Sequence, residues 1–276
     1  MRLCHNMSSL GLYNAYKKNI VSNASASEKI SSGVKINSAK DNPGKIGQSE
    51  LMRIQLKSLE SAERNVQDGV SMLQTADGAL QEVNNVLSRI KELTVSEKNG
   101  TNSPEDVDTI QSEIYQLRDE IDEISKNTQF NGVKMLGDES VTDNTNPAEE
   151  SIVTGSMVGE KMSIPLYNIS HSVLGITDEK VENGDIDAID SAIKKISNIR
   201  GKYGAKVTVL ESTYDSLNEK YTTVQGAESS IRDADVAEEI MEFSRTQVLT
   251  TSGIGLIAQS NNLPKDCLQI LQSARR

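Results

Sequence analysis

The strongest pattern in the chain is an apolar repeat in which spacings of three and four residues alternate without a slip between residues 59 and 90. A seven-residue repeat of this length predicts one long helix with a single apolar seam. Gly69 and Gly78 do not break this pattern, because a glycine in a helix interior costs only about 1 kcal/mol. The residues of this first seam are Leu59, Ala62, Val66, Gly69, Leu73, Ala76, Leu80, Val83, Leu87 and Ile90.

A second stretch, residues 193–224, repeats the same alternation with one polar exception, Arg200. In a coiled coil, a large side chain on one helix fills a hole on its partner. The small residues Ala62, Gly69 and Ala76 are therefore expected to receive tyrosines of the second seam, and the two helices to form a rod. The residues of this second seam are Ile193, Ile196, Arg200, Tyr203, Val207, Leu210, Tyr214, Leu217, Tyr221 and Val224.

Cap signals set the limits of the helices around the first seam. Asp41 or Asn42 is expected to cap the long helix, with Pro43 at its first position, where a missing N–H does no harm. Ser103 and Asp106 have the spacing of a capping box and open a third helix. The apolar residues of this third helix, again three and four apart, are Val107, Ile110, Ile114, Leu117, Ile121 and Ile124.

The two ends of the chain are expected to form weaker helices. Residues 7–36 are rich in Ser and Asn, and Gly33 closes the helix that they predict. At the other end, Ser230 and Asp233 resemble a cap for the last helix, and Pro264 is expected to interrupt that helix. A helix with few large apolar residues is marginal in water. We therefore expect both ends to order only against partners.

Residues 128–184 change to Gly, Asn, Thr and short apolar runs, and Asn131-Gly132 signals a hairpin turn. The fold class expected is mainly α: a long antiparallel helical bundle or coiled-coil rod, with a small hairpin-containing outer segment and paired terminal helices. The expected divisions are an N-terminal helix at 1–42, N-terminal rod helices at 43–136, a short outer β or loop segment at 137–184, a C-terminal rod helix at 185–226 and a C-terminal helix at 227–276.

Composition supports narrow helical seams over one thick globular core, because the chain has no Trp, two Phe and 36% hydrophobic residues. A net charge of −11, with no basic stripe interleaved with aromatics, argues against binding to nucleic acid. No apolar run is long enough for a membrane-spanning helix, so no membrane insertion is expected. Residues 1–10 lack the apolar core of a secretory signal peptide.

Candidate catalytic and metal-binding residues are scarce. The only histidines, His5 and His171, have no carboxylate at metalloprotease spacing, and no phosphate loop or nucleophile elbow occurs. Asp233 and Asp235 are better explained as helix caps than as a catalytic carboxylate pair. Two cysteines are too few for a disulfide framework or a zinc site. We therefore expect no enzyme activity, no cofactor and no metal.

Several motifs occur in a fixed order at the two ends of the chain. They are His5-Asn6, Ser31-Ser32-Gly33, Arg64-Asn65-Val66-Gln67-Asp68-Gly69, Thr128-Gln129-Phe130-Asn131-Gly132, Ile231-Arg232-Asp233-Ala234-Asp235 and Leu268-Gln269-Ile270-Leu271. The ordered set spans roughly residues 1–137 and 189–272. It resembles bacterial flagellin, in a short form without large outer insertion domains.

This resemblance implies a structural subunit that polymerises into the bacterial flagellar filament for motility, with the terminal helices in an inner tube. It also implies export through the flagellar type III apparatus and a secreted, extracellular location. The partners implied are further copies of the chain, an export chaperone, the filament cap protein and the hook–filament junction proteins.

Two further expectations follow from the resemblance. Arg89, Leu93 and Glu113 match the family's recognition positions for a host Toll-like receptor, although an exposed helix face would also explain them. If the terminal helices pair antiparallel, Cys4 and Cys267 fall at similar heights and could form a disulfide. Two unpaired thiols are the alternative for that cysteine pair.

Other functions stay open at this point. A hook–filament junction protein resembles flagellin at both ends of the chain. A type III-secreted membrane translocator is also helical and lacks a signal peptide, but it needs a strongly hydrophobic hairpin, which this sequence does not contain. A flagellin that carries an enzyme domain would need a protease motif, which is missing as well.

Overall fold

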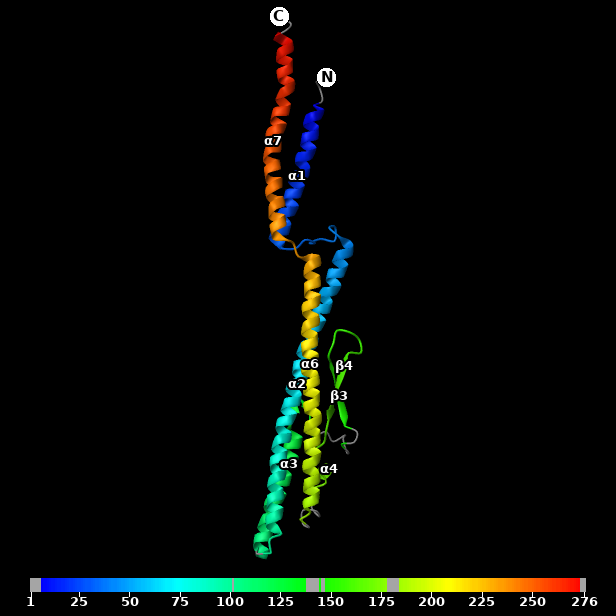
Figure 1. The fold of residues 1–276 in the computed structure, drawn as a ribbon, viewed down its shortest axis with the longest axis vertical. Helices are drawn as coiled ribbons and strands as arrows, with labels where there is room; N and C mark the ends of the chain where they lie inside the picture. Colours follow the sequence, from blue (N-terminus) through cyan, green and yellow to red (C-terminus); the bar gives the residue numbers. More distant parts are fainter. Residues whose placement is uncertain (1–5, 101, 138–143, 145–146, 178–183, 274–276) are drawn as a thin grey trace. The chain divides into compact units, whose positions relative to one another are not determined.

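A computed structural model describes residues 6–100, 102–137, 144, 147–177 and 184–273, without the side chains of 263–268 and 271–272. The chain forms two compact units, each treated separately below: unit 1 contains Met1–Ile54 and Thr223–Arg276, and unit 2 contains Gln55–Thr222. The elements (Figure 1) are α1 (Met7–Ser32), α2 (Pro43–Glu97), α3 (Pro104–Asn127), β1 (Gln129–Phe130), β2 (Val133–Lys134), β3 (Ala148–Val153), β4 (Lys161–Leu166), α4 (His171–Leu174), α6 (Ile186–Arg232) and α7 (Val236–Ser273). The expected mainly α class is confirmed.

The core of unit 2 lies along α2. All ten residues of the first seam are buried, and Val66, Leu73 and Leu80 have no exposed surface. At Gly69 an added Cβ would lie 2.6 Å from Cδ1 of Ile152 and 3.5 Å from Cδ1 of Leu210. The hole at Gly69 therefore receives an isoleucine from β3 and a leucine from α6, so the expectation of a tyrosine there is wrong.

The buried face of α6 only partly follows the second seam. Its wholly buried members are Ile196, Tyr203, Leu210 and Leu217, and the other members are half-buried. Near its start α6 buries further residues outside the seam: Ile189, Ala192 and Ile199.

Near its start the buried face of α6 is wider, because α4 and β4 contact this helix in addition to α2. Lys195 donates to the carbonyls of Val173 and Leu174 at 3.1 and 3.0 Å, and Tyr203 donates to the carbonyl of Pro165 at 3.0 Å. Burial raises the pKa of the Tyr203 hydroxyl well above its usual range.

Arg200, the polar exception in the second seam, lies at the edge of the contact between α2 and α6. Its guanidinium donates to Asp77 with a Nε–Oδ1 distance of 2.8 Å, and it also donates to Gln81. Hydrogen bonding to Asp77 raises the pKa of Arg200. A charge held at the rim in this way gives the helix pair a polar contact that fixes its register.

The caps around α2 and α3 follow the local sequence. The side chain of Asn42 accepts from the backbone N–H of Lys45 at 3.1 Å, with Pro43 as the first residue of α2. Ser103 and Asp106 form the expected capping box, and the hydrogen bond from Ser103 lowers the pKa of Asp106. Gly33 ends α1 in the left-handed conformation, with φ of 69°.

Two small hairpins complete unit 2. Strands β1 and β2 are joined by Asn131 and Gly132, whose φ angles of 50° and 83° belong to the turn that their sequence favours. Strands β3 and β4 pair antiparallel, with Ala148 opposite Leu166. The second hairpin lies against α2 and α6, and its buried side chains include Ile164 and Leu166.

The last two helices depart from expectation. Ser230 donates to the carbonyl of Gly226 inside α6, which continues to Arg232, so the expected cap at Ser230 and Asp233 is wrong. The cap of α7 is Asp235, whose carboxylate accepts from Ala237 and Glu238 at 2.9 and 3.3 Å. The expected interruption at Pro264 is also wrong, because α7 runs to Ser273.

The seam at Leu73 provides a direct test of this packing. We expect Leu73→Ala to lower the free energy of unfolding of the monomer by about 2–5 kcal/mol, because it leaves a cavity at a fully buried site. Urea unfolding followed by circular dichroism measures this change. The control Thr75→Ala, at an exposed position on the same helix, should change stability by less than about 0.5 kcal/mol. Equal effects of the two substitutions would contradict the packing described.

Candidate functional site

The described residues contain no candidate metal site. No group of three or more His, Cys, Asp or Glu residues among them could hold a metal ion. His171 lies in α4, where its Nδ1 is 2.8 Å from Asp122 Oδ2 and its backbone N–H also donates to Asp122. The contacts between His171 and Asp122 connect α4 to α3. The other histidine, His5, lies outside the described residues. The surfaces of the helices are therefore the candidate functional features.

In unit 1, α1 and α7 pair side by side and antiparallel (Figure 1). Polar contacts are spread along the whole pair: Lys29 Nζ lies 2.9 Å from Glu239 Oε1, and Asn23 donates to Thr246 Oγ1 at 3.0 Å. Four residue pairs mark the register, namely Lys29 with Glu239, Asn23 with Thr246, Tyr16 with Gly253 and Asn6 with Ser260.

Asn6 connects the two helices at their far end. Its Oδ1 accepts from the backbone N–H of Ser9 and caps α1, while its Nδ2 donates to the carbonyl of Ser260 at 2.8 Å. That carbonyl lacks the usual helical donor four residues later, because Pro264 has no N–H. The side chain of Asn6 therefore supplies a donor to the carbonyl whose usual partner the proline removes, in a helix that continues to Ser273.

A second polar cluster in unit 1 lies where α1 and α6 end. Val34 pairs with Asp233 in a short antiparallel bridge, and Arg232 accepts from the N–H of Lys35 at 2.6 Å. The guanidinium of Arg232 donates to Glu50 at 3.1 Å and to Ser49 at 3.3 Å. Hydrogen bonding to Arg232 lowers the pKa of Glu50. These bonds hold the start of α2 beside the end of α6.

Unit 1 buries little apolar surface. Of its described apolar side chains, only Ala26 and Ile36 are buried. A stable unit normally covers most of its large apolar residues, and a large exposed apolar surface indicates an interaction site. The exposed set in unit 1 is Met7, Leu10, Tyr13, Ile20, Val21, Leu51, Ile54, Val236, Ile240, Met241, Val248, Leu249, Ile254, Leu256 and Ile270. We call this set the apolar surface of unit 1.

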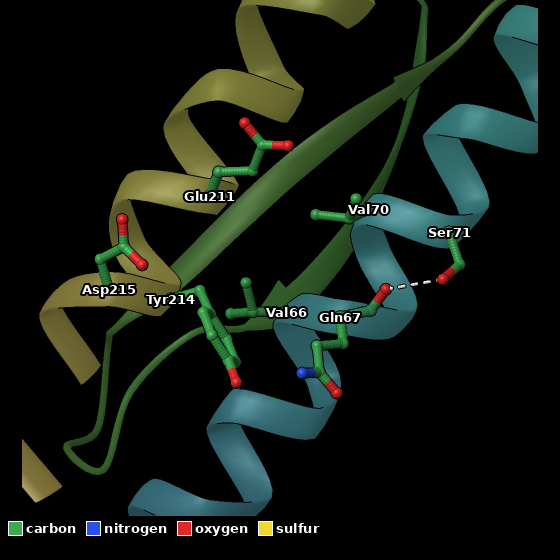
Figure 2. Close-up of a pocket in the computed structure, with 7 residues that line it drawn as sticks. All are labelled: Val66, Gln67, Val70, Ser71, Glu211, Tyr214 and Asp215. Atoms are coloured by element: carbon green, nitrogen blue, oxygen red, sulfur yellow. Dashed lines mark hydrogen bonds between the residues drawn. The ribbon is translucent and has the colours of Figure 1, made fainter. Parts of the chain in front are cut away.

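Unit 2 has a groove between α2 and α6, with a volume of about 630 Å³ (Figure 2). It is lined by Val66, Gln67, Val70, Ser71, Glu211, Tyr214 and Asp215. In the close-up the ring of Tyr214 lies beside Val66 between the helices, and the two carboxylates project from α6.

The structure brings together two of the three expected receptor-contact residues. Arg89 Nη2 lies 2.9 Å from Glu113 Oε1, and both side chains are about half exposed on α2 and α3. The bond to Glu113 raises the pKa of Arg89. Leu93, by contrast, is buried, so it can support this surface only from beneath. Cys4 and the side chain of Cys267 lie outside the described residues.

The sequence pattern did not identify the polar residues that organise unit 1, such as Asn6, Ser49 and Arg232. Asn6 carried a local signal, since an asparagine before a helix is a common cap. Its bond to Ser260 has no local signal, because the two residues are 254 positions apart.

Known proteins match this chain over nearly its whole length. The family model for the bacterial flagellin N-terminal helical region matches residues 3–142, and that for the C-terminal helical region matches residues 186–271. The flagellin of Halalkalibacterium halodurans is 37% identical, and that of Bacillus subtilis is 35% identical. Each alignment covers 99% of this chain and 100% of the relative.

A hook-associated protein structure offers the rival comparison. The structure of a putative flagellar hook-associated protein from Vibrio parahaemolyticus covers 70% of this chain and all of its own, with a TM-score of 0.58. At 13% identity this likeness shows a shared fold alone. The two family models and the full-length relatives decide the matter: the chain belongs to the bacterial flagellins.

Proposed function

We propose that this flagellin polymerises into the extracellular flagellar filament through the apolar surface of unit 1. The observation that carries the proposal is the contrast within this unit, which buries Ala26 and Ile36 while its large apolar side chains face outward on α1 and α7. Further copies of the same chain would cover these side chains, and ordering of the helix pair would then be coupled to assembly.

The low intrinsic stability that we infer for the terminal helices is also compatible with export of an unfolded chain. Helices held together mainly by polar contacts, such as those of Asn23 and Lys29, have little apolar burial to lose on unfolding. We infer that the chain passes through the flagellar type III apparatus unfolded and regains its terminal helices at the growing end.

Several partners follow from this route. A chaperone would cover the apolar surface of unit 1 before export, because exposed apolar helices otherwise associate without control. The filament cap protein and the hook–filament junction proteins would meet the same surface at the two ends of the polymer. The Arg89 and Glu113 pair on unit 2 is proposed as a contact for a host Toll-like receptor.

Seeded assembly tests the proposed function. Purified wild-type protein added to short filament seeds should elongate them into tubes visible by electron microscopy. Val248→Asp should stop elongation, because burying an unpaired carboxylate in an interface costs several kcal/mol. The control Val248→Leu keeps the apolar character and should assemble. Normal filaments from Val248→Asp would show that this part of α7 is not covered on assembly.

The bond between Asn6 and the carbonyl freed by Pro264 predicts a coupling between these positions. Asn6→Ser keeps a capping oxygen but removes the Nδ2 donor, so the filaments should dissociate at a lower temperature. In a Pro264→Ala background the carbonyl of Ser260 regains an N–H partner, and Asn6→Ser should then cost about 0.5–3 kcal/mol less. The dissociation temperature of filaments is measured for the wild type, for Asn6→Ser, for Pro264→Ala and for the double variant. Asn14→Ser, at an exposed asparagine on α1, is the control. Equal losses in both backgrounds would exclude the coupling.

The receptor contact is tested on monomers. Arg89→Ala should reduce Toll-like receptor signalling at least tenfold in dose while the far-ultraviolet circular dichroism spectrum stays unchanged, because the exposed guanidinium and its bond to Glu113 are removed. Arg64→Ala is the matched control, since Arg64 is also an exposed arginine of α2 in an ion pair, with Glu60. An unchanged dose response for Arg89→Ala would dismiss this contact.

A further inference from the structure

The loop that joins β3 to β4 presents apolar side chains to solvent. Val158 at its tip is fully exposed, and the neighbouring Met157 is exposed by 68%. Both residues lie in unit 2, whose other large apolar side chains are mostly buried in its core. Two adjacent apolar side chains on a protruding turn indicate a contact with another molecule.

The loop is held in one conformation by its own polar groups. Thr154 donates its N–H to the carbonyl of Glu160 at 3.0 Å, and the carboxylate of Glu160 accepts from the N–H of Met157 at 3.0 Å. Any side chain at Gly155 would collide with Glu160, which lies over it. A loop ordered before binding loses little entropy on binding, so Met157 and Val158 form a preorganised knob.

The groove between α2 and α6 offers a matching hole in the same unit. Its accessible apolar side chains are Val70 and Tyr214, both half-buried, which lie beside the fully buried Val66. Two acidic side chains, Glu211 and Asp215, border the groove (Figure 2). Lys161, an exposed lysine at the start of β4, comes three residues after Val158, and its charge is opposite to that of the border. Glu160, between them, has its carboxylate held inside the loop by the N–H of Met157.

The knob does not point toward the groove of its own chain. Along β3, Ile152 lies over Gly69, and the next residue, Val153, accepts at its carbonyl from Asn65 at 3.3 Å. The strand therefore runs toward the N-terminal end of α2, and the loop after it continues past Asn65, away from residues 66–71 of the groove. A second chain is needed to bring the knob and the groove together.

We propose that the knob formed by Met157 and Val158 docks into the groove between α2 and α6 of a second copy of this chain. The inference rests on the proposed function, because it names a contact within the polymer. A knob and a hole at different places on one molecule give a heterologous contact, which builds open polymers when the rotation between copies does not close. The contact would add to the one made by the apolar surface of unit 1.

Cysteine cross-linking in filaments tests this contact. In a background with Cys4→Ser and Cys267→Ser, the double variant Val158→Cys/Ser71→Cys places one thiol on the knob and one at the groove. After seeded assembly and mild oxidation, each chain should be linked to the next, giving a ladder of covalent multimers on a non-reducing denaturing gel. The control pair Val158→Cys/Ser88→Cys uses an exposed serine of α2 outside the groove and should give no ladder.

The outcomes separate the inference from the proposed function. Filaments of the Val158→Cys/Ser71→Cys variant that yield no ladder would overturn the docking contact alone, whereas wild-type protein that grows no filament would overturn the proposed function and the contact with it.

Substitutions of Val158 by residues of opposite charge give a second measurement. Because the groove has an acidic border, Val158→Asp should raise the critical concentration for assembly about tenfold more than Val158→Lys. Equal effects of the two charges would also overturn the contact.

Discussion

Burial of the seam between α2 and α6 is the interaction on which the other parts of unit 2 depend. The seam residues of α2 between Val66 and Leu80 are buried, and each large apolar side chain among them contributes about 1.5–3 kcal/mol. The β3–β4 hairpin packs on this seam. It does so through Ile152 at Gly69, and Tyr203 reaches from α6 to the carbonyl of Pro165. Neither hairpin would be stable in isolation, since two strands alone are marginal in water.

Unit 1 is built on the opposite principle. Its helices contact each other through Asn6, Asn23 and Lys29, whose bonds are directional and specify the register without burying much apolar area. Such bonds are worth little net energy each, because water offers the same groups equivalent partners in the unfolded chain. The helix pair thus has a defined arrangement but a small intrinsic stability, and its outward apolar side chains leave the missing stability to be supplied by other molecules.

The sequence predicted the features that depend on neighbouring residues. The first seam follows from its spacing, and the turn at Asn131-Gly132 follows from the backbone angles that these two residues tolerate. The errors came from contacts between distant segments. Pro264 breaks a helix by local rules, yet Asn6 satisfies the carbonyl that the proline frees. Likewise, Ser230 matched a cap pattern, but α6 continues to Arg232, and the next residue, Asp233, pairs with Val34. The composition of the two ends did predict helices that need partners, but periodicity did not predict the groove between α2 and α6, since spacing shows that a face is apolar but not what covers it.

The distribution of apolar side chains over α1 and α7 has a consequence for assembly. Joining two proteins costs roughly 4–15 kcal/mol in lost freedom of motion, whereas one apolar side chain contributes about 1.5–3 kcal/mol when fully buried. No single residue of the apolar surface of unit 1 can therefore hold a subunit in place. Several must be covered together. In the proposed assembly, a subunit added to the end of a polymer can cover more of this surface than a subunit that meets one free copy. This difference favours growth on existing ends over association of free subunits.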